Sequence, residues 1–311
     1  MKNGNPCYSP EHKDLVSRRD FLNVMMQGVV ASSALGVTIP STLSHAAAPP
    51  ITDLTGTPGF GAAKHVIYVM LDGGFSHMDS FDLKQGIDSQ YTGETKPIAT
   101  SVDDYFIGHW LPRMAKHMDK TCVVNSRKSH VGAHAQGQYY VRTGYEMRGQ
   151  DRHPHLGSWT SHFLDSLNES IPSNFIINSP SSHPLSGWMN PKLAPLPIRD
   201  PKQGLPSLKN WQGEERLMRR LKLSRDLGKK FRTRYANEDI QSIAPLYKDA
   251  LEMMNSEDIV AFDIKKEPDW KREAYGHNKL GEGLLLAKRL VEHGVRHVEV
   301  SHGGWDHHNN I

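Results

Sequence analysis

Two strand-like runs that end in an acidic loop constrain the fold of this chain more than any other feature. Residues 64–71 (KHVIYVML) are almost continuously apolar, rich in β-branched side chains, and stop at Asp72 and two glycines. Such a run is typical of a strand that is covered on both faces of a parallel sheet. Residues 295–300 (VRHVEV) alternate as a strand and lead through a second glycine pair to Asp306. The two runs predict an α/β fold in which two strand ends deliver acids to one edge of a sheet.

Helical periodicity and glycine stops predict the elements between these two runs. Short apolar runs at 121–125 and 174–178 predict two further strands. The proline-rich stretch 179–208 predicts a long surface excursion. The predicted helices are residues 110–118, 133–142, 158–167, 212–230, 239–254 and 280–291. Alternation of helix and strand favours crossover units and a parallel sheet.

The first 48 residues predict an export signal of the twin-arginine type. Arg18 and Arg19 precede a soft apolar segment, and small residues before Pro49 suit cleavage. The alternative is a membrane anchor, but the apolar segment is short and diluted by glycine and serine, so no stable span is expected after cleavage. We expect a signal peptide over 1–48, a linker over 49–63 and one domain over 64–311, with a periplasmic or exported location.

The charge balance argues against a nucleic-acid partner. Lys+Arg 37 against Asp+Glu 34 gives a net charge of only +3, and no basic run replaces the missing charge. The chain has 18 histidines, and imidazole is the commonest side-chain metal ligand in proteins. Because the number of histidines does not locate a metal site, candidate ligands are chosen by their spacing in the sequence.

The stretch SHGGWDHH after the second strand-like run is a candidate metal site. Asp306 and His308 are two residues apart and can face one ion from a turn, with His307 between them. Together with Asp72 they offer carboxylate and imidazole without thiolate, which favours Zn²⁺ or Mn²⁺ over Ca²⁺ or Mg²⁺. The alternative is a polar loop in which Trp305 packs onto the core.

A second candidate site lies between residues 125 and 149, where hydroxyl, imidazole and cationic side chains gather around a predicted helix start. Ser129, His134 and Arg142 are the candidate catalytic residues. A helix amino terminus with arginine and lysine nearby suits an anionic oxyacid such as phosphate or sulfate. The alternative is a basic surface turn.

The ordered motifs of the chain resemble a known family. The motifs SRRDFL, HVIYVMLDGGFSHMDSFDLK, LPRMAKHMDK, RTGYE, AFDIKKEP and LLLAKRLVEHGVRHVEVSHGGWDHHNN resemble the exported bacterial family called domain of unknown function 1501. That family is itself similar to the alkaline phosphatase and sulfatase superfamily. The resemblance implies a doubly wound, mostly parallel sheet with metal ions at its carboxyl edge, and cleavage of phosphate or sulfate esters.

The resemblance also suggests roles for individual residues. Asp72, Asp306 and His308 match metal-binding positions of the superfamily, and His134 falls in the slot of the nucleophile. An imidazole in that slot is a departure, so His134 is a metal ligand or an acid/base, and Ser129 is the fallback nucleophile. Family members continue beyond GGWDHH, so we expect the 311-residue chain to be a piece of a longer protein, incomplete at its carboxyl end and inactive as it stands.

These observations predict an exported, metal-dependent hydrolase-like protein that acts on a small anionic phosphate or sulfate ester. Its other expected partner is the twin-arginine export machinery. The alternative is a non-catalytic exported binding protein that keeps the fold and a vestigial metal site. A hydroxyl nucleophile is missing at His134, which is the feature that keeps this alternative open.

Overall fold

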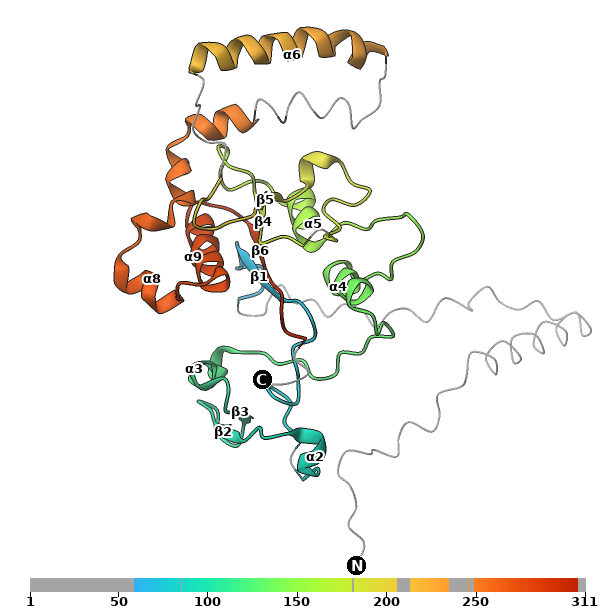
Figure 1. The fold of residues 1–311 in the computed structure, drawn as a ribbon, viewed down its shortest axis with the longest axis vertical. Coiled ribbons are helices and arrows are strands. Elements are labelled where there is room, and N and C mark those ends of the chain that lie inside the picture. The colour runs from blue at the N-terminus through green and yellow to red at the C-terminus, as the bar shows by residue number, and fades with distance from the viewer. Residues whose placement is uncertain are drawn as a thin grey trace, which may run out of the picture. The chain divides into compact units, whose positions relative to one another are not determined.

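Four parallel strands, in the order β1-β6-β4-β5, form the main sheet of the computed structural model (Figure 1). The strands are β1 (Val66–Leu71), β4 (Asn174–Ile177), β5 (Leu196–Ile198) and β6 (His297–His302). The structure describes residues 59–84, 86–180, 182–205, 213–234, 246 and 249–306, and residues 63–311 form one unit. The mixed α/β class and the parallel sheet predicted from the sequence are confirmed.

Helices precede and follow the strands along the chain. The described α-helices are α2 (Ser89–Thr92), α3 (Pro112–Ala115), α4 (His134–Thr143), α5 (Leu156–Phe163), α6 (Glu214–Arg234), α8 (Asp269–Tyr275) and α9 (Lys279–Glu292). Short 3₁₀ helices are η2 (Met118–Lys120), η3 (Pro191–Leu193), η4 (Glu257–Phe262) and η5 (Ile264–Lys266). None of the helices in the described ranges is both long and apolar enough to cross a membrane.

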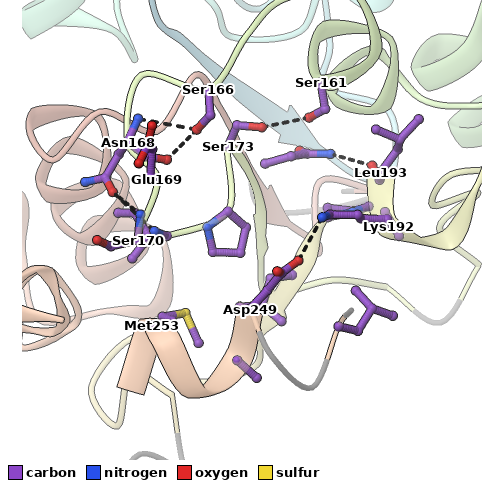
Figure 2. Close-up of a pocket in the computed structure, with 18 of the residues that line it drawn as sticks. Ser161, Ser166, Asn168, Glu169, Ser170, Ser173, Lys192, Leu193, Asp249 and Met253 are labelled. Carbon is purple, nitrogen blue, oxygen red and sulfur yellow. Dashed lines mark hydrogen bonds and ion pairs between the residues drawn. The ribbon is translucent and has the colours of Figure 1, made fainter. Parts of the chain in front are cut away.

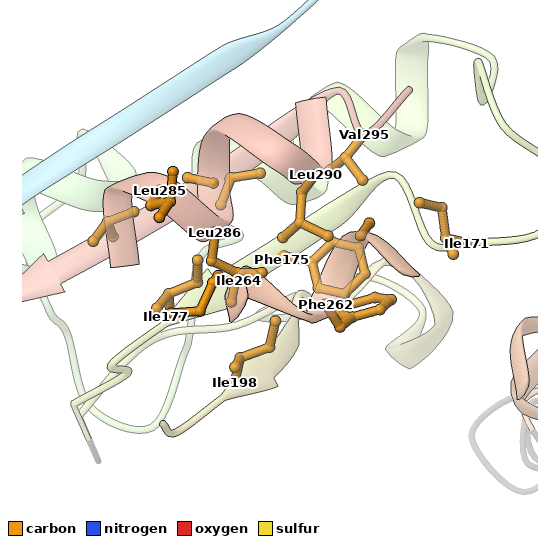
Figure 3. Packing of buried hydrophobic residues seen from close by; sticks show 14 of the residues in the cluster. Ile171, Phe175, Ile177, Ile198, Phe262, Ile264, Leu285, Leu286, Leu290 and Val295 are labelled. Atoms are coloured by element: carbon orange, nitrogen blue, oxygen red, sulfur yellow. The ribbon is translucent and has the colours of Figure 1, made fainter. Parts of the chain in front are cut away.

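Helix α9 covers one face of the sheet and forms the main hydrophobic core with it (Figure 3). Its apolar side chains, including Leu286 and Leu290, pack on Phe175 of β4 and on Val298 and Val300 of β6. Asn278 caps the helix by accepting a hydrogen bond from the Gly281 N–H at 3.0 Å. A core of this kind supplies most of the free energy that stabilises the fold.

The other face of β6 is polar and lies against α5. Since side chains alternate along a strand, His297, Glu299 and Ser301 point away from α9. A Cβ atom at Gly157 of α5 would collide with the His297 imidazole and with the amide of Asn174, so α5 packs directly on this face. Helices therefore cover both faces of the sheet, with α9 and α5 on opposite sides of it (Figure 1).

Residues 97–108 form a small antiparallel hairpin outside the main sheet. Strand β2 (Pro97–Ala99) pairs with β3 (Phe106–Gly108). Ile107 of β3 is fully buried in a second hydrophobic cluster with Ala115 and Met118. Helix α3 and η2 contribute Ala115 and Met118 to this cluster, and the helix predicted over 110–118 is divided into these two short pieces.

Most predicted elements occur in the structure. The strands predicted at 64–71, 174–178 and 295–300 are confirmed as β1, β4 and β6. The helices predicted at 133–142, 212–230 and 280–291 are confirmed as α4, α6 and α9. Helix α5 begins and ends a few residues before the predicted 158–167, and the helix predicted over 239–254 is described only at 246 and from 249 on. The leader over 1–48 and most of the linker over 49–63 lie outside the described residues.

Three sequence predictions differ from the structure. Residues 121–125 are not a strand: Val124 is 68% exposed, and Val123 packs on the cluster around Ile107, which lies outside the main sheet. Strand β5 was missed within the proline-rich stretch. Pro197 is tolerated because, among the described strands, β5 lies at an edge of the sheet and pairs with β4 alone. Strand β1 lies at the other edge of the sheet, and Ile67 and Val69 are 40% and 42% exposed, so it is not covered on both faces.

Candidate functional site

A buried polar layer follows the face of β6 that points toward α4 and α5. His297, Glu299 and Ser301 are only 1%, 1% and 2% exposed. Strand β1 adds Tyr68, which is in register with Glu299. Charged side chains in such a position must be paired, because an isolated buried charge is strongly destabilising.

Arg142 of α4 pairs with the carboxylates of this layer. Its Nε donates to Glu299 Oε1 at 2.7 Å, and its Nη2 lies 3.2 Å from Asp72 Oδ1 and 3.3 Å from Asp72 Oδ2. Nη2 also donates to Ser301 Oγ at 3.0 Å. The local fold fixes this position: α4 ends just after Arg142, and Gly144 closes it in the left-handed conformation at φ 76°.

Burial and pairing have opposite effects on the pKa values of Glu299, Asp72 and Arg142. Burial alone would raise the pKa of Glu299, but hydrogen bonds from His183 and Arg142 and the charge of Arg142 outweigh it and lower the pKa to about 2. Burial raises the pKa of Asp72, and the opposing effect of Arg142 does not fully cancel this rise. Burial would lower the pKa of Arg142, but Glu299 and Asp72 raise it overall, so the guanidinium stays charged.

Three buried histidines extend the polar layer away from Arg142. His183 Nε2 lies 3.1 Å from Glu299 Oε2, while His183 Nδ1 accepts the Leu185 N–H at 2.9 Å. Since Nδ1 accepts, the hydrogen is on Nε2, and a neutral ring satisfies both bonds. Burial is the main cause that lowers the pKa of His155 to about 3 and that of His297 to about 4, so both rings are neutral at pH 7.

The loops after β1 and β6 lie directly against each other. The Asp72 N–H donates to His302 O at 2.8 Å, and the Trp305 N–H donates to Asp72 O at 3.2 Å. A Cβ atom at Gly73 would stand 2.7 Å from the Asp306 nitrogen and 3.0 Å from the Trp305 nitrogen, so only glycine allows this approach. The two strand ends therefore meet at one edge of the sheet, as their sequences predict.

Asp306 faces His134, the first residue of α4. The distance from His134 Nε2 to Asp306 Oδ2 is 3.2 Å, and the two side chains are 60% and 48% exposed. Two ligands that each lie about 2.0–2.1 Å from a tetrahedral Zn²⁺ are about 3.3–3.4 Å apart. The pair therefore has the spacing of two neighbouring ligands of one ion, and it is open to solvent.

The remaining predicted site residues take different places. Asp72 is buried against Arg142 rather than beside His134, and within the described ranges no three His, Cys, Asp or Glu side chains are arranged to hold one ion. His307 and His308 lie outside the described residues. Ser129 is exposed, and its hydroxyl accepts the Val131 N–H at 3.1 Å in a local turn. Arg142, predicted as catalytic, has a side chain only 1% exposed.

The sequence analysis missed Glu299 and His183 as parts of this site. The signal for Glu299 was present, because an acid alternates with histidine and serine on one face of a strand whose other face is valine. His183 had no such signal. It lies in the proline-rich excursion, and only the tertiary fold brings it to Glu299, 116 residues away in the chain.

The Tyr68 hydroxyl on β1 is also affected by this network. Burial is the largest cause that raises its pKa, the charge of Glu299 adds to the rise, and the charges of Arg142 and Arg127 act in the opposite direction.

A pocket of about 480 Å³ lies at the opposite edge of the sheet (Figure 2). Asn174 and Leu196, the first residues of β4 and β5, are among its lining residues. Its polar groups largely satisfy one another; Lys192 pairs with Asp249 at 3.1 Å. This pocket is remote from the carboxyl ends of β1 and β6, so it is not the candidate site.

Comparison with known proteins places the chain in a family. No curated protein and no solved structure gives a significant match. The profile of the family described as "Protein of unknown function (DUF1501)" matches residues 63–311, which include every strand and helix described above. Since this match spans most of the chain, the protein belongs to the DUF1501 family.

Proposed function

We propose that this protein binds a divalent metal ion at the carboxyl edge of β1 and β6 and hydrolyses a phosphate or sulfate ester. The observation that supports this proposal is the 3.2 Å separation of His134 Nε2 and Asp306 Oδ2 at an exposed strand end. Imidazole and carboxylate without thiolate suit Zn²⁺ or Mn²⁺. Strand carboxyl ends are also where α/β sheets bind their ligands.

In this proposal His134 and Asp306 hold the ion, and His308 and His307, which follow Asp306 in the sequence, are the further candidate ligands. When bound, the ion supplies a Lewis acid and lowers the pKa of a water molecule. Asp72 anchors the neighbouring loop through its backbone and holds Arg142 through its carboxylate. Arg142 is a positioning residue, since its buried side chain has no access to a substrate.

The basic loop before α4 attracts the anionic ester. Arg127 and Lys128 are exposed in the segment that leads into His134, and positive charge raises the local concentration of anions. Because His134 occupies the position of a hydroxyl nucleophile in the similar superfamily, we propose that water attacks the ester directly. Ser129 is the alternative nucleophile, and Ser129→Ala distinguishes the two: direct attack by water predicts no more than a few-fold loss of turnover.

Metal content and turnover test the proposal together. His134→Ala and Asp306→Asn should each lower the affinity for Zn²⁺ or Mn²⁺ by about tenfold or more. Each should also abolish hydrolysis of aryl phosphate and aryl sulfate. His162→Ala, an exposed histidine of α5, is the matched control and should change neither. The assays use the full chain. Unchanged metal affinity in both site variants would refute the site.

The second candidate function is anion or metal binding without turnover. The specific observation that favours it is the Asp72 carboxylate, which is already neutralised by Arg142 instead of being available beside His134. A binding protein predicts tight metal uptake together with no hydrolysis of either ester by the loaded protein. Turnover that depends on Asp306 rules this candidate out.

We further propose that the chain is exported through the twin-arginine route to the periplasm. Arg18 and Arg19 precede the apolar segment of the leader, and replacing both with lysine should retain the protein in the cytoplasm. Cell fractionation measures the outcome. Export at an unchanged level would show that the protein does not depend on the twin-arginine route.

A further inference from the structure

Helix α6 (Glu214–Arg234) combines a high positive charge with little support from the rest of the chain. Its 21 residues include nine Lys or Arg and only three Asp or Glu. Within the described ranges, α6 makes no substantial contact with any other helix or strand. Its exposed cationic side chains include Arg216, Arg219, Arg220, Lys222, Lys229 and Arg234. Like charges on neighbouring turns of a helix repel each other, so an anionic surface that lies against α6 would stabilise it.

Apolar side chains are exposed among these cations. Met218, Leu223 and Leu227 are 46%, 59% and 70% exposed. Counting from Arg216, positions i+4, i+7 and i+11 are Arg220, Leu223 and Leu227. These four residues therefore lie on one face of the helix. An amphipathic helix normally buries its leucines, but this face presents two leucines and two arginines to solvent.

A hollow of about 360 Å³ lies on the same part of the helix. It is lined by Arg216, Arg219, Arg220 and Leu223. Three guanidinium groups thus surround one apolar side chain. Arg219 also pairs with Glu215 at 3.2 Å, but both side chains are exposed, so this pair contributes little to stability. Because arginine binds phosphate through paired hydrogen bonds, the hollow suits a phosphate group that is joined to an apolar chain.

An anionic phospholipid membrane fits this face better than a protein or a nucleic acid does. A protein partner that covered the leucines would also take the neighbouring guanidinium groups out of water, which is costly unless each of them is paired. A nucleic acid would bind the arginines through its phosphates but would leave the leucines exposed. At a membrane surface, the arginine heads stay at the level of the lipid phosphates, while their stems and the leucines lie against the acyl chains.

We propose that α6 is an interfacial helix that docks the protein on an anionic phospholipid membrane. Leu223 and Leu227 enter the boundary of the acyl chains, and Arg216, Arg219 and Arg220 contact lipid phosphates. The helix lies in the plane of the membrane surface and does not cross it. The proposal is independent of the proposed hydrolysis, because α6 contributes no residue to the candidate functional site.

Vesicle binding by the full chain tests the proposal. The wild type should co-sediment with vesicles of equal parts phosphatidylglycerol and phosphatidylcholine, less so at high salt, and far less with phosphatidylcholine alone. Arg216→Gln with Arg219→Gln should lower the affinity for the anionic vesicles by about tenfold or more, because each cation near the surface contributes to binding. Leu223→Gln with Leu227→Gln should lower it by a similar factor. Glutamine is a good helix former, so both variants keep α6.

Two double variants outside α6 are matched controls. Lys265→Gln with Lys266→Gln removes two exposed cations of η5 and changes the net charge by the same amount. Leu156→Gln with Leu185→Gln removes two leucines that are 50% and 42% exposed. Both controls should bind the anionic vesicles as the wild type does. A loss as large as in the α6 variants would show that net charge or general surface hydrophobicity governs binding, and would overturn the proposal.

A probe on α6 separates its contribution from that of the apolar leader, which is present in every variant. Leu223→Cys carries an environment-sensitive fluorophore in a chain with Cys7→Ser and Cys122→Ser, which removes both native cysteines. Its emission should shift to the blue with anionic vesicles and stay unchanged with phosphatidylcholine. The proposal is overturned if anionic vesicles cause no shift, or if the wild type binds a DNA duplex more tightly than these vesicles. Metal affinity at the candidate site should be unchanged in every α6 variant, so the two proposals fail separately.

Discussion

Gly73 and Asp306 lie in backbone contact, although 233 positions separate them in the sequence. A Cβ atom at Gly73 would be 2.7 Å from the Asp306 nitrogen, which is closer than side-chain atoms approach a backbone. This backbone contact joins the loop after β1 to the loop after β6, without a side-chain bond between Asp72 and Asp306. The geometry of the candidate metal pair therefore depends on a glycine that has no side chain to contribute.

Replacing Gly73 should separate the two loops. In Gly73→Ala the new Cβ collides with the Trp305 and Asp306 backbone, and the residue is strained at φ 124°, so we expect a loss of about 2–4 kcal/mol in the free energy of unfolding. Metal affinity at His134 and Asp306 should fall with it. Gly74→Ala is the control, because φ is 107° there but nothing lies within 4 Å of its Cβ. Equal metal affinity in the two variants would show that the backbone contact does not shape the site.

Glu299 should be among the costliest acids to neutralise. Glu299→Gln leaves Arg142 in a buried position with one carboxylate fewer, so we expect about 3 kcal/mol of destabilisation in urea unfolding. The control is Glu292→Gln on the exposed side of α9, where the pair with Lys288 is worth less than about 1 kcal/mol. A loss at Glu299 no larger than that at Glu292 would show that the buried network contributes little.

Acid should destabilise the protein well above the pH at which most carboxylates titrate. The pKa values of His155 and His297 are lowered to about 3 and about 4 in the fold, against 6.5 for the ordinary group. Below pH 6.5 the unfolded chain binds protons that the folded chain does not, so stability is full above pH 6.5 and falls as the pH drops toward 4. Between pH 5.5 and 4.5 the two rings together should account for up to about 2.7 kcal/mol per pH unit.

Unfolding by urea at pH 7, 5.5 and 4.5 measures this effect. His297→Gln removes one of the two titrating rings, and the slope of stability against pH should become shallower by about half. The Glu299 pKa of about 2 adds a loss only below pH 4.5, so it does not confuse this window. A stability that is flat from pH 7 to pH 4.5 would contradict the neutral, buried state of both histidines.

Gly157 should also resist substitution, for a reason unrelated to φ. Alanine normally favours a helix by up to about 1 kcal/mol over glycine. At Gly157 of α5, however, its Cβ would collide with Asn174 Oδ1 and His297 Nδ1 and stand 2.7 Å from His155 Cε1. We expect Gly157→Ala to destabilise the protein by about 2 kcal/mol or more in thermal or urea unfolding. Gly137→Ala in α4 has open space at the Cβ position and should be neutral or stabilising.

The sequence predicted the elements whose periodicity reflects burial. Helix α9 and strand β6 were found because their apolar positions face one core, and β1 was found because its run is continuous. Strand β5 was not, since a three-residue edge strand with Pro197 resembles any proline-rich loop. The strand predicted at 121–125 was wrong, because local apolar character does not show whether a neighbouring strand is there to pair with.

Part of the candidate site could be predicted from the sequence, which singled out Asp72, Asp306 and His134 but neither Glu299 nor His183. Asp72 and Asp306 follow strand ends, and strand ends are where a sheet presents its ligands, so their approach was expected. The partner of Asp72 was not: Arg142 lies 70 residues away, and whether it points outward or inward depends on how α4 packs. His183 reaches Glu299 from a segment without periodicity, which gives sequence analysis nothing to detect.

The strand order has a consequence for how the chain folds as it is synthesised. Strand β6 follows β1, β4 and β5 in the sequence yet lies between β1 and β4, so β1 has no described neighbour in the sheet until β6 is made. The side chain of His65, just before β1, likewise finds its hydrogen-bond partner, the Val295 carbonyl oxygen at 2.7 Å, only 230 residues later. Such distant pairing makes folding slow, and until it is complete the exposed edge of β1 is open to chaperones and to aggregation.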